Sequence, residues 1–138
     1  MNTLPIYPAF IGAIIKQDKR TLIFYHNKFK LYIIPVGKID KDESPYDTLL
    51  REMQEELAIE VLQAKIVFTG LVDNRLYNIP GMSHATVYEI TEYNGKITNA
   101  EPHKHNELLW LSNQQLEVYG KLYPVDELTL NLLTMGLL

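Results

Sequence analysis

Residues 37–59 read GKIDKDESPYDTLLREMQEELAI, and this stretch decides the fold of the chain. Ser44 precedes Pro45, which places a residue that caps helices directly before a proline at the first helical position. The residues that follow favour a helix, so we predict one over residues 45–57. One face of this helix is apolar and can pack on a sheet, through Leu49, Leu50, Met53 and Leu57.

The other face of the predicted helix carries three glutamates, Glu52, Glu55 and Glu56. Like charges three or four residues apart on a helix repel one another, and no lysine follows four residues downstream to pair with them. A solvated acidic face is the ordinary interpretation, but unmixed carboxylates also suit a hard divalent cation. We therefore predict binding of Mg²⁺, or of Mn²⁺ in its place, and expect Glu55 and Glu56 to face solvent and the metal.

Composition limits the classes of protein to which the chain can belong. Its 138 residues are predicted to form one domain, over residues 1–138. The net charge of -4 argues against a nucleic-acid polymer or an anionic membrane as the main partner. The chain has no cysteine, which excludes disulfides and thiolate zinc sites. It has neither a charged signal-peptide start nor an apolar run long enough to span a membrane, so we expect a cytoplasmic protein.

The remaining apolar runs alternate with turn residues, which predicts a mixed sheet with helices packed on it. We expect strands over residues 9–15, 21–25, 31–34, 64–72, 83–91 and 108–111, and a second helix over residues 125–133. Asn94 and Gly95 are a two-residue hairpin signal, so residues 96–98 are predicted to turn back against the preceding strand. The predicted fold class is α/β.

The spacing of polar residues in residues 37–59 adds a resemblance. Five residues separate Gly37 from Glu43, and seven separate Glu43 from Arg51. Residues 51–59 then follow the pattern R-E-U-x-E-E-x-G-U, where U is a bulky aliphatic residue, except at the glycine. The stretch resembles the Nudix box of the Nudix hydrolase family, in particular of its MutT-like members. The resemblance implies a Nudix-type α/β/α sandwich with a mixed β-sheet, and a metal-dependent hydrolase.

The resemblance also implies roles for residues of the box. The implied metal ligands are Glu52, Glu55, Glu56 and the backbone carbonyl near Val36 or Gly37. Glu43 would act behind these ligands or near a further metal, and Arg51 would orient the glutamates. Lys38 would contact a substrate phosphate, although a lone loop lysine is as often solvated.

Four further positions come from outside the box. Residues 100–111, AEPHKHNELLWL, resemble the segment before the last strand of MutT-like proteins, where a glutamate approaches the metals. Glu107 is the first candidate for the general base and Glu101 the second. Trp110 is either a core residue or part of a nucleobase pocket. Tyr77 would match a tyrosine of the diadenosine polyphosphate hydrolases in the family.

Departures from the family pattern concern loops and not carboxylates. Ala58, Val36 and Asp42 stand where glycines are frequent, and Ala58 must adopt a left-handed conformation or end the helix differently. The resemblance implies hydrolysis of a phosphoanhydride, first of a nucleoside triphosphate to monophosphate and pyrophosphate. A dinucleoside polyphosphate hydrolase and a non-catalytic nucleotide-sensing module are the alternatives.

The C-terminal residues 128–138 read LTLNLLTMGLL and are strongly apolar. Such a segment either packs its last helix on the core or forms a homodimer contact, and core packing is the favoured alternative. The predicted partner of the protein is thus a small nucleotide, with a homodimer as the second possibility.

Overall fold

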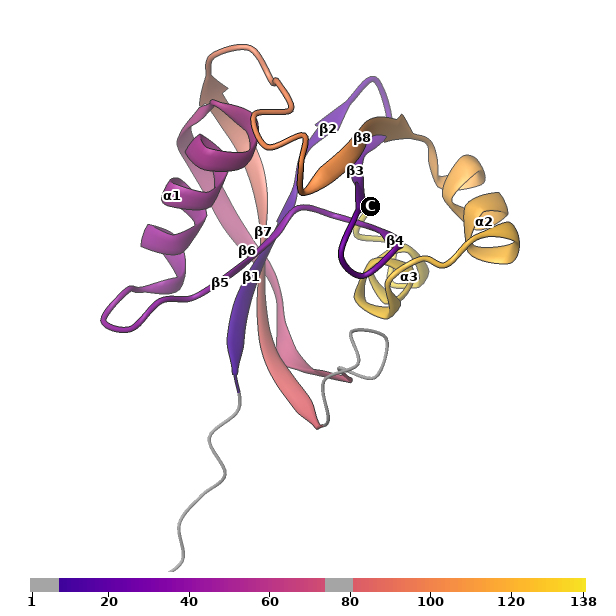
Figure 1. Cartoon of the computed structure of the whole chain (residues 1–138), viewed down its shortest axis with the longest axis horizontal. Helices are drawn as coiled ribbons and strands as arrows, with labels where there is room; N and C mark the ends of the chain where they lie inside the picture. The colour runs from indigo at the N-terminus through magenta and orange to yellow at the C-terminus, as the bar shows by residue number, and fades with distance from the viewer. Residues whose placement is uncertain (1–7, 74–80) are drawn as a thin grey trace, which may run out of the picture.

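The computed structural model describes residues 8–73 and 81–138, in which three helices lie beside two β-sheets (Figure 1). The strand order of the first sheet is β5-β1-β7-β6. The second sheet has the order β2-β3-β4, and β8 also pairs with β3. The strands are β1 (Ala9–Ile14), β2 (Lys16–Gln17), β3 (Arg20–His26), β4 (Leu31–Ile33), β5 (Val36–Lys38), β6 (Glu60–Asp73), β7 (Met82–Asn94) and β8 (His105–Leu111). The helices are α1 (Pro45–Leu57), α2 (Asn113–Leu122) and α3 (Glu127–Thr134).

The first sheet is mixed, as predicted. β1 lies parallel to β7, with Ile11 opposite Thr86, and antiparallel to β5, with Ile11 opposite Gly37. β6 and β7 form an antiparallel pair along most of their length. In Figure 1, α1 lies on one side of the strands and α2 and α3 lie on the other. The α/β/α arrangement expected from the sequence is therefore confirmed.

Both ends of α1 follow from the local sequence. The Ser44 hydroxyl accepts a hydrogen bond from the Asp47 backbone N–H at 3.0 Å, and Pro45 occupies the first turn. At the other end Ala58 is left-handed, with φ 57° and ψ 37°, and its N–H donates to the Gln54 carbonyl at 3.1 Å. The chain thus keeps the left-handed helix end without the glycine that would adopt it freely.

The apolar face of α1 packs on the first sheet as expected. Leu49, Met53 and Leu57 are fully buried, whereas Leu50 is only partly buried. Helix α1 contacts β1, β5 and β6, so its opposite face is directed away from these strands. This packing sets the rotation of the helix and hence the positions of its glutamates.

The predicted hairpin after Asn94 is wrong. β6 begins at Glu60, directly opposite Asn94, so β7 already has its antiparallel partner along this edge. Residues 96–98 instead pass the C-terminal end of α1, where the Thr98 N–H donates to the Leu57 carbonyl at 3.0 Å. The carbonyls that end a helix lack intrahelical partners, and this segment supplies donors to them.

Helix α2 was missed in the sequence, although a local signal for it exists. Ser112 and Gln115 form a reciprocal capping box, with the Ser112 hydroxyl accepting from the Gln115 N–H and the Gln115 side chain accepting from the Ser112 N–H. The second predicted helix is present as α3, which begins after Asp126.

The apolar C-terminal segment packs on the core in part. Leu128, Leu132 and Leu138 are buried, while Met135 is exposed. Core packing accounts for the buried leucines, and the homodimer contact stays a prediction. Across residues 8–73 and 81–138, no helix combines the length and the apolar character needed to cross a membrane.

Candidate active site

Gly37 and Glu52 bring the loop before α1 into contact with the helix. Gly37 lies in β5, opposite Ile11 of β1. A Cβ atom at position 37 would overlap the side chain of Glu52, so only glycine leaves room for that carboxylate. The first glycine of the box is therefore required by the packing of one of its glutamates.

Arg51 is anchored by Glu43. Its Nε donates to Oε2 of Glu43 at 2.8 Å and its Nη2 donates to Oε1 at 2.9 Å, a bidentate geometry that fixes the guanidinium plane. The Thr48 hydroxyl also donates to Glu43, at 2.6 Å. These hydrogen bonds lower the pKa of Glu43 to about 2, with those from Arg51 contributing most. Glu43 thus positions Arg51 in this structure, which agrees with a place behind the metal ligands.

From this anchored position Arg51 reaches two of the box glutamates. Its Nη1 donates to Glu52 Oε1 at 2.9 Å and to Glu55 Oε2 at 3.3 Å. Its Nη2 also lies 3.3 Å from Asp40 Oδ2. The hydrogen bonds that Arg51 donates to Glu43, followed by the charge of Glu52, raise the pKa of Arg51 further above its ordinary value. Part of the repulsion among the glutamates is therefore relieved by an arginine on the same helix.

Glu56 does not face solvent, contrary to the expectation from the helical wheel. It is 4% exposed, whereas the side chain of Glu55 is 48% exposed. Burial, followed by the charge of Glu52 and a hydrogen bond shared with it, raises the pKa of Glu56 to about 9. Among residues 8–73 and 81–138, the buried Oε2 atom of Glu56 has no hydrogen-bond partner. Sheet packing turned Glu56 inward, which a wheel drawn for an isolated helix does not reveal.

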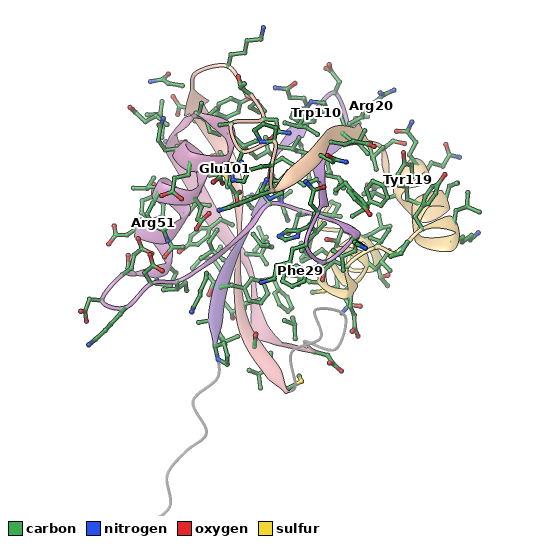
Figure 2. The ribbon with its side chains drawn as sticks, viewed as in Figure 1. Arg20, Phe29, Arg51, Glu101, Trp110 and Tyr119 are labelled. Atoms are coloured by element: carbon green, nitrogen blue, oxygen red, sulfur yellow. The ribbon has the colours of Figure 1, made fainter. Side chains whose placement is uncertain are left out.

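The loop after β7 brings Glu101 to the same place. The Ala100 N–H donates to the Glu56 carbonyl at 2.9 Å, and the charge of Glu101 contributes to the raised pKa of Glu56. The side chain of Glu101 is 17% exposed, its Oε1 is buried without a partner, and its Oε2 lies 3.1 Å from Lys104 Nζ. Figure 2 shows Glu101 and Arg51 on the α1 side of the molecule.

The other general-base candidate lies elsewhere. Glu107 is exposed on β8, opposite Tyr25, and its charge contributes to the raised pKa of Tyr32, for which burial is the larger cause. Trp110 is partly buried on β8 opposite Leu22, and it stands toward the Arg20 side in Figure 2. The structure therefore brings Glu101, and not Glu107, to the carboxylates of α1. Tyr77 lies outside the described residues.

A pocket of about 520 Å³ opens beside the carboxylates. Gly37 and Lys38 belong to its lining, which connects it directly to the glycine that packs against Glu52. Within it the rings of His26 and Phe29 stack, with centroids 4.5 Å apart. The complete lining is Pro8, Ala9, Phe10, His26, Lys28, Phe29, Val36, Gly37, Lys38 and Ser83.

The carboxylate donors fit a hard divalent cation in their chemistry. Glu56 and Glu101 each present one buried oxygen without a hydrogen-bond partner, and Gly37 keeps the space that Glu52 occupies. In the described part of the chain, however, no three acids or histidines converge as a complete ligand set. Arg51 engages Glu52 and Glu55, and Lys104 engages Glu101, so side chains must turn for such an ion to bind.

Several of these features were not identified from the sequence. His26 ends β3, Phe29 lies in the β3–β4 connection, and Lys104 comes from the loop before β8. No local pattern marks a lone histidine or phenylalanine as a pocket residue. The ion pair between Arg51 and Asp40 also depends on the path of the loop before α1.

Comparison with known proteins finds the family that residues 37–59 resemble. A family profile described as the NUDIX domain matches residues 7–133. A CTP pyrophosphohydrolase from Escherichia coli (strain K12) is 27% identical over 122 residues, which cover 84% of this chain and 83% of the relative.

Solved structures agree in fold. A MutT NUDIX hydrolase from Burkholderia pseudomallei has a TM-score of 0.79 at 23% identity, over 94% of this chain and 98% of the other. The E. coli ORF135 protein has a TM-score of 0.73 at 25% identity, over 93% and 86%. Since the profile spans most of the sequence, the chain belongs to the NUDIX domain family and is a Nudix hydrolase.

Proposed function

We propose that the protein hydrolyses the bond between the α- and β-phosphates of a nucleoside triphosphate, in a reaction that needs Mg²⁺ or Mn²⁺. The observation that carries the proposal is the junction at Gly37, which lines the aromatic pocket and also packs against Glu52. A nucleotide whose base lies in the pocket would place its phosphates beside the acidic cluster of α1. Lys38, at the same edge of the pocket, is positioned to bind a phosphate.

In the proposed mechanism, Glu52, Glu55 and Glu56 hold the divalent ion together with the Gly37 carbonyl. When bound, such an ion neutralises phosphate charge and lowers the pKa of a water molecule. Arg51, fixed by Glu43, holds the carboxylates of Glu52 and Glu55 beside each other through its Nη1.

Glu101 is the better placed general base, because it lies beside Glu56 and Glu107 does not. It accepts a proton from the attacking water, whose oxygen forms a bond to phosphorus. The α–β anhydride bond breaks, and the products are nucleoside monophosphate and pyrophosphate. The burial of Glu101 in the loop holds it in place for this proton transfer.

The E. coli relative suggests which nucleobase the substrate carries. That protein is a CTP pyrophosphohydrolase, and alignment with it covers 84% of this chain. The stacked rings of His26 and Phe29 offer a flat apolar surface for a nucleobase of any kind, so they support a nucleotide without selecting cytosine. Because that relative is a CTP pyrophosphohydrolase, we place CTP first among the substrates to be tested.

The alternatives are a dinucleoside polyphosphate hydrolase, which Tyr77 would support, and a non-catalytic nucleotide-sensing module. The retention of Glu43, Arg51 and the three box glutamates argues against the second alternative. A module that only senses a nucleotide has no need for carboxylates that repel one another.

One assay separates these functions. Purified protein is incubated with Mg²⁺, and separately with Mn²⁺, against nucleoside triphosphates that include CTP and oxidised forms, dinucleoside polyphosphates, ADP-ribose and nucleotide sugars. We expect monophosphate and pyrophosphate in equal amounts from one triphosphate, and no product with EDTA. Cleavage of a dinucleoside polyphosphate alone would support the first alternative. Nucleotide binding without any turnover would support the sensing module.

A further inference from the structure

The side chain of Lys104 lies at the acidic cluster formed by Glu52, Glu56 and Glu101. Its Nζ is 3.1 Å from Glu101 Oε2. Glu101, Glu52 and Glu56 each raise the pKa of Lys104 through their charges. The ammonium group therefore stands near two of the three proposed metal ligands as well as near the proposed general base.

The backbone of Lys104 is held by hydrogen bonds, while its side chain is held only by the ion pair with Glu101 among the described residues and is largely exposed. Its N–H donates to the Glu101 carbonyl at 2.9 Å, and its carbonyl accepts from the Asn27 N–H at 2.9 Å. The Asn27 side chain also donates to the His103 carbonyl, at 2.9 Å. In contrast, 55% of the Lys104 side chain is exposed to solvent. A lysine held in this way can leave Glu101 by rotating about its own side-chain bonds, with no change in the loop.

Glu101 has one oxygen on Lys104 and one that is buried without a partner. A general base that is paired with an ammonium group is a weaker proton acceptor than a free carboxylate. A doubly charged cation at Glu52 and Glu56 would repel Lys104 and weaken this ion pair. Metal binding and the release of Glu101 would then be one event.

We propose that Lys104 is a resident counter-cation of the acidic cluster, which competes with the divalent metal and is displaced from Glu101 when the metal binds. The inference rests on the proposed function in assuming that the glutamates of α1 bind a metal. Lys104 is a positioning residue in this scheme, because it acts through Glu101.

Metal affinity without nucleotide tests the proposal. Mn²⁺ is titrated into wild-type protein and into Lys104→Gln, with free Mn²⁺ followed by electron paramagnetic resonance at low ionic strength. Removal of one positive charge near a divalent ion is expected to tighten binding by roughly five- to tenfold, and added salt should reduce the difference. Lys104→Arg keeps the charge and is expected to bind Mn²⁺ as the wild type does.

Lys121→Gln is the matched control, since Lys121 lies on α2, across the molecule from α1 in Figure 1. It should leave Mn²⁺ affinity unchanged. The proposal would be overturned if Lys104→Gln bound Mn²⁺ no more tightly than the wild type. It would also be overturned if Lys104→Arg and Lys104→Gln bound Mn²⁺ equally more tightly than the wild type. If the wild type and all the variants fail to bind Mn²⁺, the proposed metal site itself fails. If instead the wild type binds Mn²⁺ and Lys104→Gln binds it no more tightly, the metal site stands and only the role proposed for Lys104 fails.

Discussion

Substitution of Ala58 by glycine should stabilise the protein, because the end of α1 is held in a conformation that disfavours a Cβ atom. Ala58 has φ 57° and ψ 37°. A left-handed residue with a Cβ costs about 1–2 kcal/mol, while glycine adds about 0.4–1 kcal/mol of flexibility to the unfolded chain. The free energy of unfolding should therefore rise by about 0.5–1 kcal/mol. For a chain of this size the midpoint of thermal unfolding would increase by about 2–4 °C.

Thermal unfolding followed by circular dichroism measures this change directly. Ala64→Gly is the matched control, because Ala64 lies within β6 and its φ is not in the left-handed region. Glycine inside a strand should lower the free energy of unfolding, by about 0.5–1 kcal/mol. A midpoint for Ala58→Gly that is equal to or below that of the wild type would refute the strain at this helix end. Mn²⁺ affinity should not change, since the left-handed end is already formed.

Three further variants test the site. Glu56→Gln should lower turnover by orders of magnitude. The pKa of Glu56 is raised to about 9, so the contribution of its protonated carboxyl to the free energy of unfolding is complete below about pH 4.5 and is lost as the pH rises toward 9. The metal-free variant should therefore lose less stability than the metal-free wild type over this range. Glu43→Gln should change the acid stability instead. The pKa of Glu43 is lowered to about 2, so the contribution of its carboxylate to the free energy of unfolding is present above about pH 4.5 and is lost as the pH falls toward 2. Gly37→Ala should weaken Mn²⁺ binding in a calorimetric titration, because the added methyl group displaces Glu52.

Matched controls separate these effects from general damage. Glu55→Gln changes the same chemical group one residue away, but Glu55 is half exposed, so the stability of the metal-free protein at high pH should follow the wild type. Gly70→Ala is the control for Gly37→Ala, since its methyl group would meet only the ring of Phe68, at 3.1 Å. Equal Mn²⁺ affinities in the two alanine variants would contradict the role given to Gly37. A Glu43→Gln variant with the acid stability of the wild type would contradict the anchoring of Arg51.

Helix α1 was predictable because its signals are local. Ser44 and Pro45 start it and the apolar residues fix its packed face, each through interactions within a few residues of the chain. The spacing from Gly37 to Arg51 also pointed to the family. This spacing is local because Gly37 packs against Glu52 and Arg51 binds Glu43, all within the same stretch.

The proposed general base and the pocket were harder to predict. Glu101 reaches α1 only because the loop after β7 donates hydrogen bonds to the last carbonyls of that helix. Residues 96–98 were predicted to form a hairpin, since the turn signal of Asn94 and Gly95 takes no account of β6 as an existing partner of β7. Sheet pairing between distant segments overrode the local preference.

The sequence alone therefore determined the helix, its N-terminal cap, the carboxylates and the family to which the chain belongs. Only the tertiary structure decided that Glu56 is buried, that Glu101 and not Glu107 lies beside it, and that Lys104 forms an ion pair with Glu101. It also decided that His26 and Phe29 stack in a pocket next to Gly37. The physical reason is that capping and spacing depend on neighbours along the chain, whereas burial and charge pairing depend on segments that meet only when the two sheets and α1 pack together.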